Sequence, residues 1–278
     1  MGRRQNAGEW SRYWAYPDLG VELLRAHYVE HRYAPHIHET YAFGLVEGGR
    51  QTFACRGERF YSTGGSIFAI NPGDAHDGEA ADERGFVYRM IYVTPEAMSA
   101  QLRDAAPRAG LPLFRLPKFG DAEVARLLAR AHNSFLDGGP RLSCHHHLQE
   151  FLIAIVRHAQ QEPPRNFNAP SPAALSRVRD YLHARFRDDV SLNELAHVAG
   201  LGRHHLTRSF TRAYGIAPHR YLTQLRLAAA RRQLQRGCAI AEVAAAVGFA
   251  DQSHLHRRFR AAFGITPRQY QRAVTNVQ

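Results

Sequence analysis

The feature that most constrains this sequence is a duplication near its C-terminus. Residues 194–221 and 242–270 repeat one pattern of small, apolar and aromatic positions. Corresponding residues are 48 positions apart up to a shared glycine, Gly200 or Gly248, and 49 positions apart in the stretch after the turn. The extra residue falls in a turn, where an insertion costs least. The chain therefore contains two similar structural units in tandem.

Each copy has the pattern of a helix-turn-helix. Leu195-Ala196 and Val243-Ala244 supply an apolar side and a small residue that a second helix can cross closely. Gly200 and Gly248 suit the end of the first helix, where a left-handed backbone is needed. The second helix has apolar residues four apart, which are Leu206 and Phe210 or Leu255 and Phe259. A joining helix is predicted from Tyr221 to about Leu234.

The second helix of each unit leaves a polar side open to solvent. Arg can form two hydrogen bonds with guanine and Gln with adenine, while Thr and His contact base edges or a methyl group. These sides are therefore candidates for contact with the major groove of DNA. Their residues are Arg203, His204, Thr207, Arg208 and Thr211 in the first unit, and Asp251, Gln252, Ser253, His254, Arg257 and Arg258 in the second.

The net charge of +11 lies entirely in the C-terminal part of the chain. From Pro170 onward there are 17 Arg, no Lys and 6 Asp or Glu, whereas residues 1–169 carry 19 basic and 19 acidic groups. A domain that approaches phosphates is expected to carry such an excess. A merely solvated basic face is the alternative, and the duplicated motif disfavours it. The partner predicted here is double-stranded promoter DNA.

The N-terminal half has a different pattern. Between Val21 and about Val93, short runs of strand-forming residues separated by Gly, Pro and Asp predict a β-barrel or sandwich. The aromatic stretch before it, with Trp10 and Trp14, is either an arm over the barrel or an extra strand. Two amphipathic helices follow, the first capped by Asp121. Their apolar sides are Val124, Leu127, Leu128 and Phe135, then Leu148, Phe151, Leu152, Ile155 and Val156.

This helical pair either joins two copies of the protein or only covers the barrel, and we expect a homodimer. A polar, proline-rich stretch at residues 160–172 cannot continue the second helix. We therefore expect a barrel domain at residues 1–162, a linker at 163–172 and a DNA-binding domain at 173–278. The fold class is α+β, with a barrel and a helical pair first and an all-α double helix-turn-helix second.

No apolar run approaches the roughly 20 residues that cross a bilayer. The basic start of the chain is followed by polar Gln5, Asn6 and Glu9, where a signal peptide needs apolar residues. We therefore expect a cytoplasmic protein with no membrane partner. Three scattered cysteines favour reduced thiols over a disulfide framework or a zinc-cysteine site. They are Cys55, Cys144 and Cys238.

At the duplicated motif the chain resembles the AraC/XylS family of bacterial transcription regulators. The likeness spans roughly residues 175–272, and the stretch from Ile240 through Phe263-Gly-Ile-Thr-Pro267 to Tyr270 matches the family signature closely. The resemblance implies seven helices, two of which are recognition helices. Gly202 departs from the family, which usually has Ser or another capping residue there. The base-contacting positions that the resemblance implies are His204, Thr207, Arg208, Gln252, Ser253, His254 and Arg257.

The N-terminal region resembles the cupin-type sensor of the same family. His36-Ile-His38-Glu39 and Asn71-Pro-Gly-Asp-Ala-His76 stand where cupins carry their two motifs. The general cupin metal site also needs a Glu three or four residues after the first pair, and Ala42 and Phe43 stand there instead. Histidines two apart on a strand point to one side, so His36, His38 and His76 can converge on an organic effector or on a metal ion.

We expect an effector without a metal or another cofactor in this barrel. Strand alternation puts Tyr88, Met90 and Tyr92 on one side of the run from Phe86 to Val93, with Arg89 and Ile91 on the other. Tyr88 is either an ordinary barrel-core residue or a hydrogen-bonding partner of the effector. We therefore add Tyr88 to the three histidines as an effector-binding candidate.

These features predict a regulator in which a small molecule bound in the barrel changes how the basic domain engages a promoter. The resemblance favours activation, with RNA polymerase as a partner, and leaves repression open. Two alternatives remain, a metal-dependent cupin enzyme tethered to DNA and an architectural DNA binder with a degenerate barrel. The sequence shows no nucleophile–base arrangement and no phosphate-binding glycine loop, so we expect no catalytic residues and no enzyme.

Overall fold

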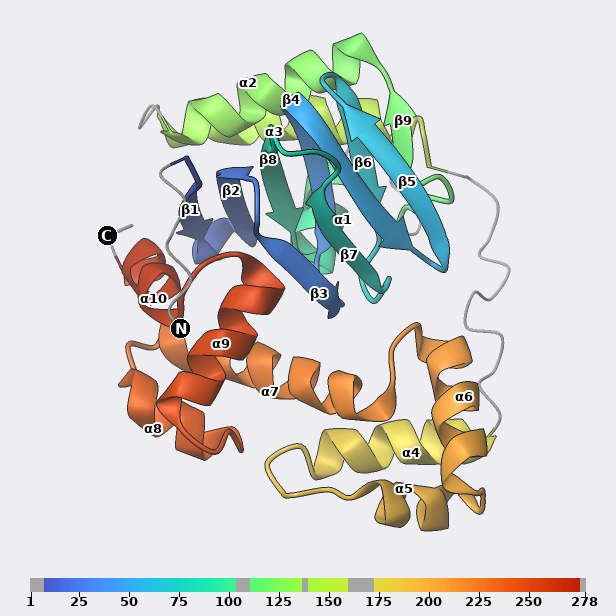
Figure 1. The fold of residues 1–278 in the computed structure, drawn as a ribbon. Coiled ribbons are helices and arrows are strands. Elements are labelled where there is room, and N and C mark those ends of the chain that lie inside the picture. The colour runs from blue at the N-terminus through green and yellow to red at the C-terminus, as the bar shows by residue number, and fades with distance from the viewer. Residues whose placement is uncertain (1–7, 104–110, 137–139, 160–172, 276–278) are drawn as a thin grey trace. The chain divides into compact units, whose positions relative to one another are not determined.

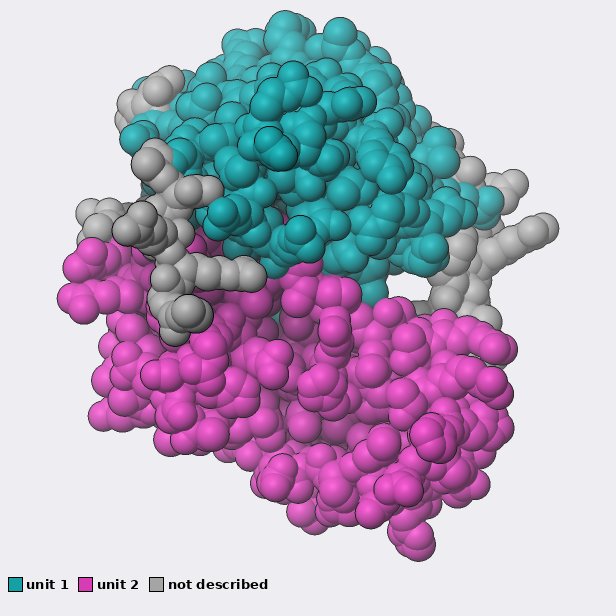
Figure 2. Space-filling view, in the orientation of Figure 1, with its two compact units in different colours: residues 1–32, 38–163, 277 teal, residues 33–37, 164–276, 278 magenta. Residues whose placement is uncertain are grey.

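The computed structural model describes residues 8–103, 111–136, 140–159 and 173–275. The chain divides into two compact units, one with residues 1–32 and 38–163 and the other with residues 33–37 and 164–276 (Figure 2). The expected linker at 163–172 lies outside the described residues. No helix among the described residues is both long and apolar enough to cross a membrane.

The N-terminal unit is built on β-strands (Figure 1). Six strands follow one another in the order β1-β2-β8-β4-β6-β9, while β5 and β7 pair with β4, and β3 pairs with β7. Because β4 is 15 residues long, it contributes to both groups of strands, and its pairing with β8 shifts register between Val46 and Gly48. The aromatic stretch Trp10–Tyr16 is a strand, β1, antiparallel to β2. The others are β2 Val21–Tyr28, β3 Arg32–His36, β4 Tyr41–Cys55, β5 Glu58–Thr63, β6 Ser66–Ile70, β7 His76–Ala80, β8 Phe86–Val93 and β9 Lys118–Gly120.

Helices cover one side of this sheet. They are α1 (Pro95–Leu102), α2 (Ala122–Leu136) and α3 (Arg141–Val156). The apolar sides predicted for α2 and α3 pack with buried residues of β2, β4, β6 and β8 in one core. Asp121 caps α2 as predicted, because its Oδ1 accepts a hydrogen bond from the Val124 amide at 3.0 Å. The helical pair therefore covers the sheet, which is one of the two roles predicted for it.

Alternate residues of β8 face opposite sides of the sheet, and only one of these sides is covered by the helices. Ile91 lies in the core under the helices, and the Arg89 Nη1 donates to the Ala129 carbonyl of α2 at 3.2 Å. Alternation therefore turns Tyr88 away from the helices. Its ring lies 5.0 Å from that of Phe86 and 6.5 Å from that of Phe68, measured between centroids. The far side of the sheet is thus lined with aromatic rings.

The secondary structure of residues 173–275, the C-terminal part of the second unit, is all helical and comprises seven helices, as the resemblance implies. The two helix-turn-helix units are α5–α6 and α8–α9, and α7 joins them (Figure 1). The joining helix starts at Pro218, three residues earlier than expected, because proline suits the first turn of a helix. The bounds are α4 Ala173–Ala184, α5 Leu192–Ala199, α6 Arg203–Tyr214, α7 Pro218–Gln235, α8 Ile240–Ala246, α9 Gln252–Phe263 and α10 Pro267–Thr275.

Candidate nucleic-acid interface and sensor site

The first helix of each unit ends as the sequence predicts. Gly200 and Gly248 have φ angles of +66° and +88°, in the left-handed region that favours glycine. The first helix of unit one, α5, begins with a capping box, in which the Ser191 hydroxyl accepts from the Glu194 amide and the Glu194 carboxylate accepts from the Ser191 amide. These ends fix where the second, recognition helix of each unit starts.

Recognition helix α6 starts without a side-chain cap. Gly202 precedes it in an extended conformation (φ −67°, ψ 149°) and offers no side chain to its first amides. Leu206 and Phe210 are buried on the inner side, while His204 and Arg208 are exposed. The predicted division between an apolar and a polar side of this helix is therefore present.

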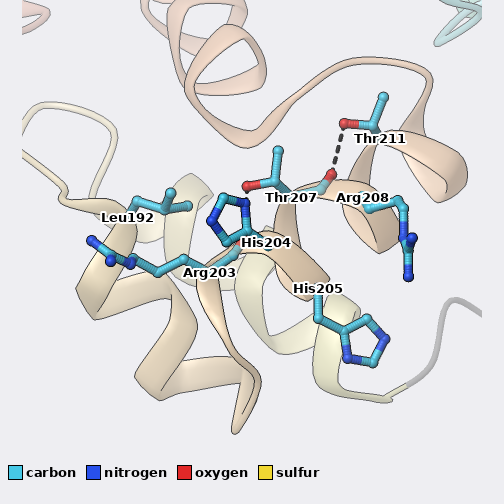
Figure 3. Close-up of a pocket in the computed structure, with 7 residues that line it drawn as sticks. All are labelled: Leu192, Arg203, His204, His205, Thr207, Arg208 and Thr211. Atoms are coloured by element: carbon cyan, nitrogen blue, oxygen red, sulfur yellow. Dashed lines mark hydrogen bonds between the residues drawn. The ribbon is translucent and has the colours of Figure 1, made fainter.

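The polar side of α6 borders an open groove of about 980 Å³ (Figure 3). Thr207 donates its hydroxyl proton to the Arg203 carbonyl at 2.9 Å, so its oxygen remains an acceptor and its methyl group a contact surface. Leu192, at the start of α5 and 40% exposed, adds an apolar contact that the sequence patterns did not single out. The lining residues are Leu192, Arg203, His204, His205, Thr207, Arg208 and Thr211.

Recognition helix α9 starts with a cap. The Asp251 carboxylate accepts a hydrogen bond from the His254 amide at 2.6 Å, so this exposed residue also caps the helix. Gln252, Ser253 and Arg257 are exposed on this helix. The two recognition faces therefore differ both in their residues and in how their helices begin.

His254 is held from two directions. Its ring meets the Phe249 ring edge-on at 5.2 Å between centroids, and its Nε2 accepts from the Arg258 Nε at 3.3 Å. Partial burial, with Arg258 and Arg257 beside it, lowers the pKa of His254. His254 is therefore a neutral, oriented side chain near pH 7, and Arg258 is engaged with it.

In the sensor region the structure brings the three predicted histidines together. His36 ends β3, His38 follows it, and His76 begins β7, which pairs with β3. All three are buried, and one ring nitrogen of each lies within 4.8 Å of those of the other two. The rings of His38 and His76 are 5.1 Å apart between centroids. The sequence motifs predicted that the three histidines can converge, but they gave no distances.

Backbone contacts place a hydrogen on Nδ1 of two of these rings. The Nδ1 of His36 donates to the Ala34 carbonyl at 2.7 Å, and the Nδ1 of His76 donates to the Asp74 carbonyl at 2.9 Å. Burial lowers the pKa of His76, which is therefore neutral at pH 7. A neutral imidazole that donates from Nδ1 presents Nε2 as an acceptor or a metal ligand.

Tyr88 and Tyr92 point to the same side of β8 but have different neighbours. Tyr88 belongs to an aromatic cluster with Tyr28, Phe68 and Phe86. The Tyr92 ring lies 5.1 Å from that of His38, between centroids. Tyr92, which is not among the predicted site residues, therefore lies beside His38, and Tyr88 extends the same side of the sheet with aromatic rings.

Known proteins share both halves of this arrangement. A family model described as an AraC-like ligand binding domain matches residues 18–156, and one for a helix-turn-helix domain matches residues 195–273. The uncharacterized HTH-type transcriptional regulator YbfI of Bacillus subtilis (strain 168) is 28% identical over 238 residues, 85% of this chain and 86% of YbfI. The HTH-type transcriptional activator RhaS of Escherichia fergusonii is 25% identical over 229 residues, 78% of this chain and 80% of RhaS.

Solved structures show the same two-domain fold at low sequence identity. The crystal structure of ToxT from Vibrio cholerae O395 is similar with a TM-score of 0.54 and 11% identity, covering 97% of this chain and 99% of ToxT. ToxT from Vibrio cholerae strain SCE256, crystallised with a bound unsaturated fatty acid, has a TM-score of 0.55 and 10% identity, covering 99% of both chains.

The fold and the matched domains define a helix-turn-helix transcription regulator with an N-terminal ligand-binding domain. The ligand-binding model covers half of the chain, and the helix-turn-helix model covers most of the remainder. The chain belongs to the AraC family of transcription regulators.

Proposed function

We propose that this protein activates transcription when a small molecule binds in the N-terminal barrel. The observation that carries this proposal is the pair of helix-turn-helix units with exposed polar faces. Both units lie in the part of the chain that holds the whole net charge of +11. An effector can act only if it binds the two states of the regulator with different affinity. RNA polymerase is the partner that an activator requires, and the similarity to the transcriptional activator RhaS supports this choice.

The residues that we propose for base contact lie on the two recognition helices. Arg257 and Gln252 are exposed and can each form two hydrogen bonds with one base. Arg258, engaged with His254, is better suited to hold that ring in place or to reach a phosphate. The remaining proposed contacts are His204, Thr207, Arg208, Ser253 and His254.

The effector site that we propose lies at His36, His38 and His76, with Tyr88 on the aromatic side of the sheet. His76 is neutral at pH 7 and carries its proton on Nδ1, so its Nε2 is an acceptor and favours a ligand that donates a hydrogen bond. The neighbouring rings favour an apolar or aromatic body. We therefore propose a hydroxyl-bearing small molecule of partly apolar character, and the fatty acid bound to ToxT marks the simple carboxylic acids as the class to compare.

Thermal shift of the whole protein tests this assignment. A matching ligand at 100 times its dissociation constant adds roughly 2.7 kcal/mol to the stability of the domain that binds it. We expect stabilisation by phenols or sugars and a weaker effect of carboxylic acids, with His76→Gln abolishing the shift. DNA footprinting and transcription with purified RNA polymerase then test the regulator itself. Transcription that is insensitive to every stabilising ligand would rule out effector control.

A bound metal ion is a second candidate for the same histidines. Metal-binding histidines usually donate their other ring nitrogen to a carbonyl or carboxylate, as His36 and His76 do here. Three buried imidazoles whose ring nitrogens lie within 4.8 Å of one another suit a zinc-like ion, although the carboxylate of the general cupin site is replaced by Ala42 and Phe43. Elemental analysis of the purified protein decides, because a sub-stoichiometric metal content eliminates this candidate.

We further propose that the protein is a homodimer joined through α3. Leu142 and Ile153 are 82% and 40% exposed, and their spacing puts them on one side of this helix. Two exposed apolar side chains on one side of the helix suit contact with a second copy of it. Sedimentation of wild type and Leu142→Glu measures the association state. A monomeric wild type would exclude the dimer.

A further inference from the structure

Helix α7 sets the distance between the two helix-turn-helix units more firmly than it sets their angle. Its 18 residues span about 27 Å at 1.5 Å per residue. A tilt of about 10° about one end of such a rod moves the other end by about 5 Å, which exceeds the roughly 3.4 Å rise of one base pair. The half-site spacing that the protein accepts therefore depends on further contacts that fix the angle between the two helix-turn-helix units.

Arg226, near the middle of α7, makes a second connection. Its Nε donates to the Phe186 carbonyl at 2.7 Å, and its Nη2 donates to the Asp188 carbonyl at 2.8 Å. Two bonds from one planar guanidinium fix its orientation as well as its position. Both carbonyls belong to the segment between α4 and Ser191, the residue that caps α5. Arg226 thus ties the joining helix to the start of the first unit.

The turn of the second unit touches the same segment. A Cβ atom on Gly248 would lie 2.5 Å from the Arg187 carbonyl oxygen and 3.1 Å from the Arg226 Nε. Only a residue without a side chain allows the turn between α8 and α9 to lie this close. Arg187 lies between Phe186 and Asp188 in the chain. Of three successive carbonyls, the outer two therefore accept from the joining helix and the middle one contacts the second unit.

The shared segment is itself held by local bonds. The Asp188 amide donates to the Arg185 carbonyl and the Val190 amide to the Asp188 carbonyl, both at 3.0 Å. The Arg185 guanidinium also pairs with the Asp188 carboxylate at 3.1 Å. A segment with these bonds can transmit the position of one unit to the other.

We propose that Arg226, Gly248 and the Phe186–Asp188 backbone form a brace that fixes the angle between the two helix-turn-helix units, and thereby selects the spacing of the half-sites that the protein accepts. The brace rests on the proposed function, since it requires both units to contact one DNA molecule. Arg226 is a positioning residue, because it acts on DNA through the two recognition helices.

Binding of the full-length protein to a series of duplexes tests the brace. The duplexes carry both half-sites of the footprinted operator at natural spacing, the same half-sites with one base pair added or removed, or one half-site with the other scrambled. We expect Arg226→Gln to weaken binding at natural spacing about tenfold, a change of about 1.4 kcal/mol. Binding to single half-sites should stay within about twofold, and the penalty for altered spacing should disappear.

Two further variants sharpen this test. Arg226→Lys keeps a charged donor without the fork and should recover part of the spacing preference. Arg220→Gln, on an exposed arginine of the same helix, should leave the spacing preference unchanged. Equal weakening on every duplex, or an unaltered spacing preference in both Arg226 variants, overturns the brace. A wild-type protein that gains nothing from its second half-site contradicts the proposed two-unit contact instead.

Discussion

Single side chains of the recognition helices divide into those engaged within the protein and those open to DNA. The hydroxyl of Thr207 donates to its own helix, and Arg258 donates to His254. Arg257 is exposed on the same helix as His254, one turn further on. It is therefore the side chain best placed to give specificity at one base pair, because a bidentate contact with guanine needs an unengaged guanidinium.

Arg257→Ala should weaken operator binding by about 1–3 kcal/mol and relax preference at one base position. Arg257→Lys retains the charge without the fork, so it should recover affinity for random DNA but not the base preference. Titrations against the operator and against every substitution of the contacted base measure both effects. Equal loss on operator and random DNA would mean that Arg257 contacts only phosphate.

A buried histidine in the N-terminal unit makes folding sensitive to acid. His132 is 0% exposed on α2, its Nε2 donates to the Leu24 carbonyl at 3.2 Å, and burial, with Arg89 beside it, lowers its pKa to about 4. Since the unfolded chain takes up a proton near pH 6.5, stability is complete above that value and is lost as the pH falls towards 4.

Because of His132, the free energy of unfolding should fall by about 2 kcal/mol between about pH 7.5 and about pH 5. His132→Gln can still donate to Leu24 but cannot take up a proton, so it should remove that part of the acid sensitivity. Urea unfolding of both proteins at the two pH values gives the difference. Identical pH dependence in wild type and variant would show that His132 does not cause it.

At the scale of helices and strands, apolar spacing and glycines were sufficient to predict the two helix-turn-helix units, because Leu206 and Phe210 repeat at helical intervals. Strand alternation likewise predicted that Tyr88 and Tyr92 share one side of β8, but not that the helices cover the other side. Asp251 was assigned only to the polar side of its helix, although Asp directly before a helical run is the same signal that predicted the Asp121 cap. The Arg226 contacts were also invisible, because backbone carbonyls of a distant loop leave no trace in residue identity.

The unequal starts of α6 and α9 lead to a stability prediction. Gly202 has an extended backbone with nothing within 4 Å of an added Cβ, so Gly202→Ser can supply the missing cap without strain. We expect a gain of about 0.5–1 kcal/mol from the cap and from reduced freedom of the unfolded chain. Asp251→Ala should cost about 1 kcal/mol. Thermal unfolding measures both, and a destabilising Gly202→Ser would contradict the assignment of Gly202 as the N-cap.

In the whole molecule, the excess positive charge lies in the same C-terminal part of the chain that forms the helical domain. The part from Pro170 onward carries the entire excess of +11, while residues 1–169 are balanced. Long-range attraction to phosphates therefore arises in the C-terminal unit, whose helices surround buried residues of their own, among them Leu182, Leu206, Leu234 and Phe259. A unit with its own core and its own charge is expected to bind DNA without the sensor.

A fragment of residues 172–278 should accordingly fold and bind DNA alone. Each phosphate contact releases counterions, so a protein with 6–10 such contacts loses roughly 10³–10⁵ in affinity between about 50 and 200 mM salt. Per DNA-binding domain, the fragment and the full-length protein should show the same salt slope, because both contain the same phosphate-contacting arginines. Only the full-length protein should respond to an effector. Circular dichroism and titrations at several salt concentrations measure these properties. An unfolded fragment would contradict the expected domain boundary, and affinity that is insensitive to salt would contradict the role of the arginines.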